Sequence, residues 1–159
     1  MVPFQVVLIP TLLIVKSFGL IDTLGALIVP NLVTAFGIFM MRQFFLALPP
    51  DLEEAGRIDG ASRLGVFTKI LVPLMGPPLA TLAILTFLSI WNDFLWPLVA
   101  VQSPENMTMQ LGLSTFQGAH LTDWPLLMAA TLVSQLPVLV LFLAGQRLVV
   151  RSIASSGIK

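Results

Sequence analysis

The sequence predicts an all-α protein that crosses a membrane several times. Hydrophobic residues make up 57% of the 159 residues and charged residues only 10%, and the mean hydropathy is +0.96. A soluble domain usually carries about 25% charged residues, and a fold of this length could not hide so much apolar surface from water. A bilayer removes the conflict, because there lipid faces the apolar side chains.

The positions of the charges divide the chain into spans. No charged residue lies between Asp22 and Arg42, between Lys69 and Asp93, or between Asp123 and Arg147, and these gaps hold 19, 23 and 23 residues. A spanning helix needs about 20 apolar residues. With a shorter apolar stretch before Lys16, the pattern predicts a transmembrane helical bundle of about four spans, near residues 1–19, 23–41, 75–99 and 125–147.

The basic residues predict which connections face the cytoplasm. The connection 42–75 and the C-terminal tail hold most of the basic residues, whereas the first and third connections hold only Lys16. Cytoplasmic loops carry the excess of Lys and Arg. We therefore expect 42–75 and the C-terminus inside, and the connections 16–22 and 100–124 outside.

The connection 49–73 has the pattern of a helix, a turn and a second helix. Asp51 can cap the first helix with Glu54 three residues later, Gly60 can end it in the left-handed conformation, and Ser62 can cap the second helix. A short amphipathic helix on the inner side suits the groove of a partner or the lipid surface. The residues alone leave both alternatives open.

A polar cluster near the end of the 75–99 segment is the candidate for a solute pathway. It contains Trp91, Asn92, Asp93 and Trp96, and an acidic group in or near a span marks a possible functional site. The alternative is that Asn92 and Asp93 satisfy backbone groups freed by Pro97. Gln135 in the last segment is a further pathway candidate, although we expect Gln135, like Asn31 in the second segment, to hydrogen-bond between helices.

Several function classes lack their signatures in this sequence. There is no cysteine, and the single histidine, His120, has no partner cluster, so we expect no metal site. No Gly-x-x-x-x-Gly-Lys-Ser/Thr loop is present for ATP, no catalytic set is evident, and a net charge of zero gives no attraction for nucleic acid. A secondary-transporter fragment would need acids at mid-span, and an intramembrane enzyme would need a catalytic pair within the bilayer.

The 49–73 segment resembles the cytoplasmic loop of permease subunits of binding-protein-dependent ATP-binding-cassette importers. That pattern reads Glu-Ala-Ala, three residues, Gly, nine residues, then Ile-x-Leu-Pro. Gly56 replaces the second alanine, at a cost of up to about 1 kcal/mol to the helix, and Val72 replaces the leucine. The resemblance implies that the loop couples the protein to an ATPase through Glu53, Glu54, Ala55, Gly56, Asp59, Gly60, Ala61, Ile70 and Pro73.

Further stretches are similar to the carbohydrate-uptake branch of that family, and in particular to the maltose-type and glycerol-phosphate-type second permease. They are Phe-Gly-Ile-Phe at 36–39, Arg-Gln-Phe-Phe at 42–45, Ile-Asp-Gly-Ala-Ser at 58–62, Trp-Asn-Asp-Phe-Leu-Trp-Pro at 91–97 and the tail Gly-Ile-Lys. The typical subunit has six spans, so we expect this chain to match its C-terminal part, with two N-terminal spans missing.

The resemblance also implies an assembly and a location. The expected partners are an ATP-binding-cassette ATPase dimer, which itself binds the ATP, a second homologous permease, and an extracytoplasmic solute-binding protein, with lipid around the spans. The expected location is the plasma membrane of a bacterium or archaeon, with several passes. The expected role is import of a sugar or sugar derivative, and this subunit is expected to have no enzymatic activity or cofactor of its own.

Overall fold

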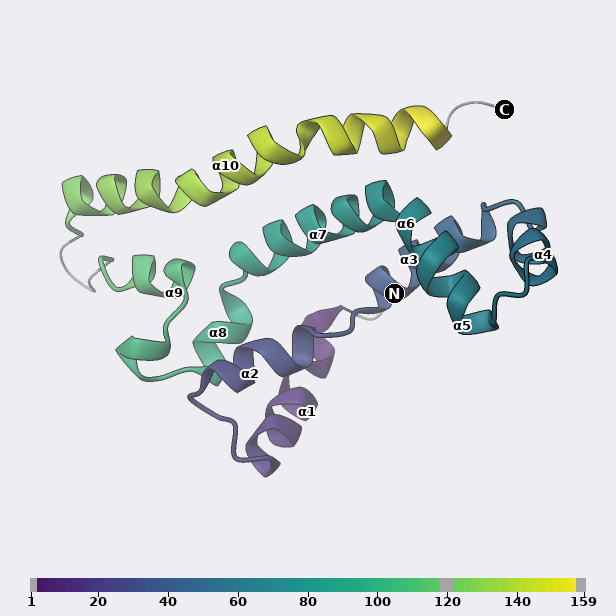
Figure 1. Ribbon diagram of the computed structural model, residues 1–159. Coiled ribbons are helices and arrows are strands. Elements are labelled where there is room, and N and C mark those ends of the chain that lie inside the picture. Colours follow the sequence, from purple (N-terminus) through teal and green to yellow (C-terminus); the bar gives the residue numbers. More distant parts are fainter. Residues whose placement is uncertain (1–2, 118–121, 157–159) are drawn as a thin grey trace. The chain divides into compact units, whose positions relative to one another are not determined.

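The computed structural model describes residues 3–117 and 122–156, of which 146–156 are described as backbone only. The described residues form helices and no strand, apart from an isolated bridge between Gln117 and Thr122. The all-α prediction is thereby confirmed (Figure 1). The elements are α1 (Phe4–Ser17), α2 (Leu24–Ile28), the 3-10 helix η1 (Val29–Asn31), α3 (Ala35–Leu46), α4 (Asp51–Ile58), α5 (Arg63–Val66), the π-helix η2 (Phe67–Leu71), α6 (Val72–Leu74), α7 (Gly76–Trp91), α8 (Leu95–Ala100), the 3-10 helix η3 (Pro104–Asn106), α9 (Met109–Ser114) and α10 (Trp124–Ser156).

The chain divides into two compact units. The first unit comprises Met1–Val33 and Phe87–Leu139, and the second comprises Thr34–Thr86 and Val140–Lys159. Each unit is built from two separate stretches of sequence, so each depends on contacts between distant residues. The second unit contains the predicted cytoplasmic connection, and the first contains both predicted outer connections.

Two stretches of the described chain are long and apolar enough to cross a membrane, Leu24–Leu46 and Trp124–Gly145. A third qualifies if Arg63–Leu74 and Gly76–Trp91, which are bent by 69° at the break between them, count as one span. Helix α1 has 14 residues, fewer than the roughly 20 that cross a bilayer. The structure thus supports a membrane protein with two or three candidate spans, and the number four stays a prediction.

The predicted segment 75–99 contains two helices with a break between them. Helix α7 ends at Trp91 and α8 begins at Leu95. Asp93 accepts hydrogen bonds from the amides of Leu95 and Trp96, at 3.1 and 3.4 Å. This carboxylate replaces the helical acceptors that those amides would otherwise need, so a new helix starts there.

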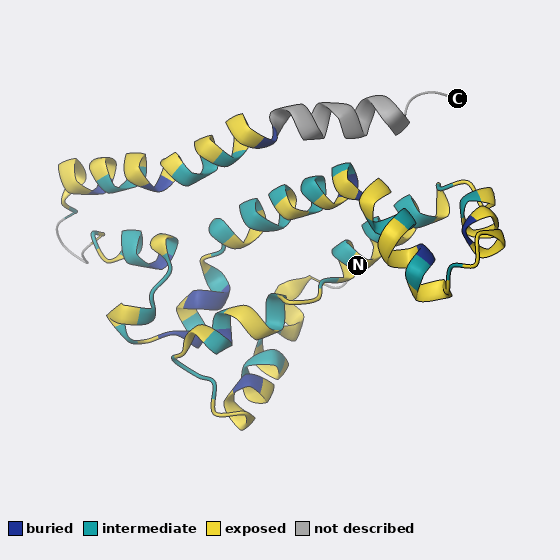
Figure 2. Ribbon diagram, viewed as in Figure 1, coloured by how far each residue is buried: buried dark blue, intermediate teal, exposed yellow. Residues whose placement is uncertain are grey.

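Most apolar side chains of the candidate spans have no cover within the chain. Only 6% of the 18-residue apolar stretch in Leu24–Leu46 and 11% of that in Trp124–Gly145 are buried. Exposed residues dominate these helices in Figure 2. Exposed apolar surface of this extent in water would be an aggregation hazard, whereas lipid or neighbouring subunits can cover it. The exposure agrees with the membrane assignment.

The core of the first unit is centred on Trp96. This residue is buried among Val15, Ala26, Ala100 and Leu111. Its indole Nε1 donates to the carbonyl of Ala26 at 2.9 Å, which satisfies the one polar atom of an otherwise apolar side chain. Trp96 therefore fixes α8 against α2.

Close helix approaches define the second unit. A Cβ atom added to Gly145 of α10 would lie 2.4 Å from Cδ1 of Ile84 on α7, so only glycine allows this separation. Phe45 at the end of α3 stacks on Phe67 of η2, with ring centroids 6.0 Å apart. Helix α10 thereby packs on α7, and the end of α3 packs on η2 of the predicted loop.

Candidate functional site

The turn of the predicted cytoplasmic loop is closed by Gly60. This glycine has a φ of +80°, which L side chains rarely adopt. The amide of Ala61 donates to the carbonyl of Gly56 at 3.0 Å, and the amide of Gly60 donates to that of Arg57 at 3.1 Å. These two bonds are the Schellman arrangement for the end of a helix. The prediction that Gly60 ends the first helix is confirmed.

Gly56 allows the two halves of the loop to touch. It is buried, and an added Cβ would lie 2.8 Å from Cδ1 of Ile70 and 3.0 Å from Cγ2 of Val66. Helix α4 therefore packs on α5 and η2 through a face that has no side chain at this point. The sequence predicted only a cost in helix propensity for Gly56, and its packing role was missed.

Both helix starts in this loop can be compared with the predicted caps. The Ser62 hydroxyl accepts from the amide of Gly65 at 3.2 Å, as predicted. The capping role of Asp51 is wrong, because Pro50 is the N-cap and already has helical dihedral angles. Asp51 instead lies in the first turn with Glu53 and Glu54, where the helix dipole favours negative charge.

The outward side of the loop combines acidic and apolar residues. Glu53, Glu54 and Ala55 are exposed, while Ile58 at the end of α4 is 85% exposed and Leu64 on α5 is 71% exposed. Ile58 and Leu64 flank the tight turn, and α4 also carries the carboxylates. Apolar and acidic side chains together have the chemistry of a docking surface. Of the other predicted loop residues, Asp59 and Pro73 are exposed and Ala61 and Ile70 are half-buried.

The four predicted pathway residues lie on two stretches of the chain, three of them at 91–93 and Gln135 on α10, one residue beyond the partner of Trp91. The Trp91 indole donates to the carbonyl of Ser134 at 3.1 Å, and the Asn92 amide bonds the carbonyl of Leu88 at 2.7 Å. Gln135 is exposed on α10. Asp93 bonds backbone groups, as the alternative prediction expected. The groups it bonds are amides at the start of α8, and not groups freed by Pro97.

Asp93 lines a hollow of about 330 Å³ in the first unit. The other residues around the hollow are Phe4, Asn31, Ser89 and Ile90. The predicted bond of Asn31 to another helix is wrong, because its amide donates to the carbonyl of Leu27, one turn earlier, at 2.9 Å. An amide, a hydroxyl, a carboxylate and an aromatic ring around one hollow can hold a hydroxyl-bearing solute.

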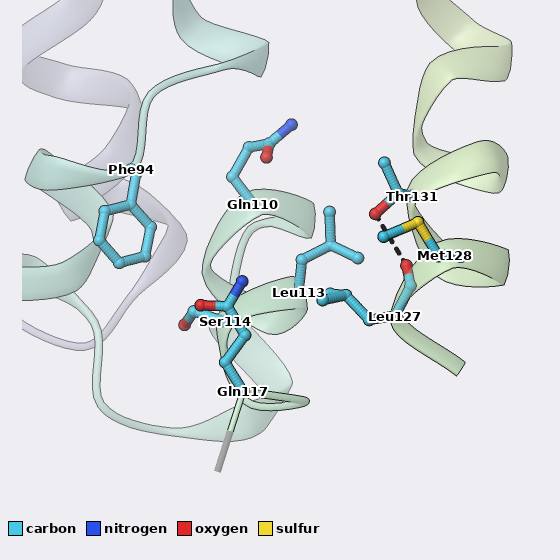
Figure 3. Close-up of a pocket in the computed structure, with 8 residues that line it drawn as sticks. All are labelled: Phe94, Gln110, Leu113, Ser114, Gln117, Leu127, Met128 and Thr131. Carbon is cyan, nitrogen blue, oxygen red and sulfur yellow. Dashed lines mark hydrogen bonds between the residues drawn. The ribbon is translucent and has the colours of Figure 1, made fainter. Parts of the chain in front are cut away.

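A second hollow, of about 380 Å³, lies between α9 and the start of α10 in the same unit. Figure 3 shows that Phe94, residues from α9 and residues from α10 surround it. The Ser114 and Thr131 hydroxyls donate to carbonyls of their own helices, at 2.6 and 2.7 Å, and keep acceptor capacity. The lining residues are Phe94, Gln110, Leu113, Ser114, Gln117, Leu127, Met128 and Thr131, none of them charged.

A cluster around Asp22 joins the two predicted outer connections. Asp22 Oδ1 accepts from the amides of Gln102 and Ser103, at 2.9 and 2.8 Å, and Oδ2 accepts from the Ser103 hydroxyl. The Asn106 amide donates to the backbone carbonyl of Asp22 at 2.7 Å. The Ser103 hydroxyl, followed by the two amides, lowers the pKa of Asp22 from 3.8 to about 2. The carboxylate is therefore ionised at any ordinary pH.

Sequence reasoning missed Asp22 because its partners lie some 80 residues away. The local pattern gave no signal for this contact, because the rule for acids in turns concerns bonds to backbone groups a few residues away. His120 and the tail 157–159 lie outside the described residues. Among the residues that are described, no group of three His, Cys, Asp or Glu could hold a metal ion.

Comparison with known proteins identifies the family. Residues 1–155 match the model of the family described as "Binding-protein-dependent transport system inner membrane component". The chain belongs to this family. This membership favours the importer interpretation over a secondary transporter and over an intramembrane enzyme, and it confirms the resemblance carried by residues 49–73.

Individual relatives are permease proteins of named transport systems. The chain is 37% identical over 159 residues to the arabinooligosaccharides transport system permease protein AraQ of Halalkalibacterium halodurans, covering all of this chain and 57% of that protein. It is 36% identical over 158 residues to the sn-glycerol-3-phosphate transport system permease protein UgpE of Shigella flexneri, covering 98% and 56%. The chain thus spans slightly more than half the length of these relatives.

A solved structure supports the fold. A chain of a bacterial ABC transporter involved in import of the acidic polysaccharide alginate matches with a TM-score of 0.77 and 27% identity. The match covers 87% of the present chain and 55% of that one. This chain therefore shares its helical architecture with that transporter chain.

Proposed function

We propose that this chain contributes to the transmembrane permease subunit of a binding-protein-dependent, ATP-driven importer for a sugar or sugar derivative. Its proposed place is the plasma membrane of a bacterium or archaeon, which it crosses several times. The proposed partners are an ATP-binding-cassette ATPase dimer, a second homologous permease and an extracytoplasmic solute-binding protein. Chemistry on ATP belongs to the ATPase, and this chain provides the coupling surface and part of the solute pathway.

The observation that carries the proposal is the geometry of the loop at 49–73. The Schellman turn at Gly60, the Ser62 cap and the glycine contact at Gly56 make α4 and α5 a small rigid body. The exposed side chains Ile58 and Leu64 stand on this body. A rigid body can transmit a push from a partner to the spans, whereas a flexible loop would absorb it.

The proposed mechanism is alternating access. When ATP closes the ATPase dimer, the docked α4–α5 body moves, and the spans reorient around a central site. Within this chain, the stacked pair Phe45 and Phe67 connects the loop with α3, and the bend of 69° before Gly76 connects it with α7. Both connections lie in the second unit, which contains the loop itself.

The docking surface can be tested without knowing the solute. In Ile58→Glu and Leu64→Glu a charge replaces an exposed apolar side chain, so the fold of this chain is preserved and the ATPase is lost from the purified complex. Thr115→Glu places the same charge on an exposed residue of the predicted outer side and serves as the control. We expect at least tenfold less co-purified ATPase for the two loop variants. Co-purification equal to that of the control would refute the docking role.

A further inference from the structure

The carboxylate of Asp22 is held by three donors of a single segment. These donors are the Gln102 amide, the Ser103 amide and the Ser103 hydroxyl. The backbone of Asp22 adds a bond in each direction, donating to the Ala100 carbonyl at 2.9 Å and accepting from Asn106. Asp22 also has a φ of +60°, a conformation that non-glycine residues adopt at a cost. The strain and the convergence of donors indicate a tightly specified contact, which we call the Asp22 clasp.

A second contact joins the same two parts of the chain. The Trp96 indole of α8 donates to the Ala26 carbonyl of α2, and Trp96 packs edge-to-face on Phe4 at 6.1 Å. A single attachment would leave α8 free to rotate about it. Two attachments, at Trp96 and just beyond the end of α8, fix its direction as well as its position.

The two elements that the clasp joins lead directly to two of the residues around the Asp93 hollow. Asn31 lies on η1, which continues directly from α2, and Asp93 lies two residues before α8. Asp22 precedes α2, and its partners Gln102 and Ser103 follow α8. The clasp therefore joins the two elements at one end, and Asn31 and Asp93 lie at the opposite end of each.

We propose that Asp22 is a positioning residue, whose carboxylate clasps residues 102–103 to the start of α2 and thereby sets the separation of Asn31 and Asp93 across the hollow. In describing that hollow as part of the solute pathway, the proposal rests on the proposed function. The residue itself touches no solute. It acts through α2 and α8.

Three variants separate the carboxylate from the backbone conformation. In Asp22→Gly the acceptors are removed, while the positive φ becomes free of strain. In Asp22→Asn an amide oxygen remains for the amides of Gln102 and Ser103, and asparagine tolerates the left-handed conformation. Ser103→Ala removes one donor only. The clasp predicts that D22G loses the fixed separation of Asn31 and Asp93, that D22N retains it, and that S103A is intermediate.

The arrangement can be measured by spin labels on the full chain in its assembled complex. Leu32 and Leu98 are 69% and 48% exposed, and the chain has no native cysteine, so Leu32→Cys and Leu98→Cys report on η1 and α8. We expect a narrow distance distribution in the parent and in D22N, and a distribution at least twice as broad in D22G. An unchanged distribution in D22G, or one equally broad in D22N, would overturn the proposal.

ATP hydrolysis by the same complex gives an independent outcome. We expect D22G to lower transport-coupled hydrolysis at least threefold and D22N to leave it within about twofold of the parent. A broadened distance with unchanged coupled hydrolysis would overturn the role in the solute pathway. A parent complex without any coupled hydrolysis would instead count against the proposed function, while the distance measurement would still decide whether the clasp sets the separation.

Discussion

Enlarging Gly56 tests whether the close contact in the α4–α5 body is essential for coupling. In Gly56→Ala the new Cβ would lie 2.8 Å from Cδ1 of Ile70, so Ile70 must leave its preferred rotamer at a cost of about 0.5–1.5 kcal/mol. The alanine returns up to about 1 kcal/mol of helix propensity. These two effects nearly cancel, so we expect G56A to change stability by less than about 1 kcal/mol and to keep coupling.

A leucine at the same position has no such compensation. Its additional carbons would overlap Ile70 and Val66, and overpacking of this kind costs about 1–3 kcal/mol. We expect Gly56→Leu to loosen α4, to accelerate hydrogen exchange of its amides at least fivefold, and to reduce co-purification of the ATPase. Ile70→Ala returns volume, so the double variant G56L/I70A should recover most of both losses. The reasoning is refuted if G56L matches G56A, or if I70A gives no recovery.

Four further predictions follow from other parts of the chain. Because the pKa of Asp22 is lowered from 3.8 to about 2, its contribution is present above about pH 4 and lost as pH falls towards 2; protection of the Gln102 and Ser103 amides in exchange experiments should follow this window, and should not do so in D22N. Gly60→Pro removes the amide that bonds Arg57 and cannot adopt a φ of +80°, so ATP hydrolysis should uncouple from transport while the protein stays in the membrane; normal transport would contradict this. Gly145→Ala forces Ile84 away from α10 and should lower thermal stability by about 1–3 kcal/mol, with Ile84→Ala restoring part of it; equal stability would show that the approach is not tight. An impermeant thiol reagent should label a cysteine placed at Gln117 in intact cells and one placed at Ser62 only after permeabilisation, and the reverse pattern would overturn the predicted topology.

Local rules predicted the loop at 49–73 well because its structure is local. The bonds at Gly60 and the Ser62 cap join residues no more than five positions apart, so the identity of one residue decides each of them. Asp51 failed as a cap for an equally local reason. Pro50 has a fixed φ and already lies in the helical region, which moves the start of α4 one residue earlier than the polar pattern indicated.

The candidate site in the first unit was less predictable. Asp93 was found from its charge, but the same side chain also starts the next helix by accepting from the amides of Leu95 and Trp96. Its neighbours in the hollow, Phe4 and Asn31, come from segments about 60 to 90 residues earlier. Hydropathy finds apolar stretches, yet it contains no information about which polar residues of different stretches meet.

The division into two units limits how coupling can reach the hollow. The α4–α5 body belongs to the second unit, and the Asp22 clasp and the Asp93 hollow belong to the first. The chain passes between the units at three places, after Val33, Thr86 and Leu139. The first passage follows a stretch without regular helix and precedes Thr34, whose backbone is extended, whereas the other two lie inside the continuous helices α7 and α10.

A continuous helix transmits axial displacement and rotation better than an extended segment, because its backbone hydrogen bonds resist bending. For the proposed coupling, α7 is therefore the mechanically effective covalent route from the loop to the hollow, whereas α10 contains Pro137, which removes a backbone hydrogen bond two residues before its passage. They touch at Gly145 and Ile84 in the second unit, and in the first unit Trp91 at the end of α7 donates to Ser134 of α10. Within each unit one contact therefore joins α7 to α10, and Asp93 lies two residues beyond the contact made by Trp91.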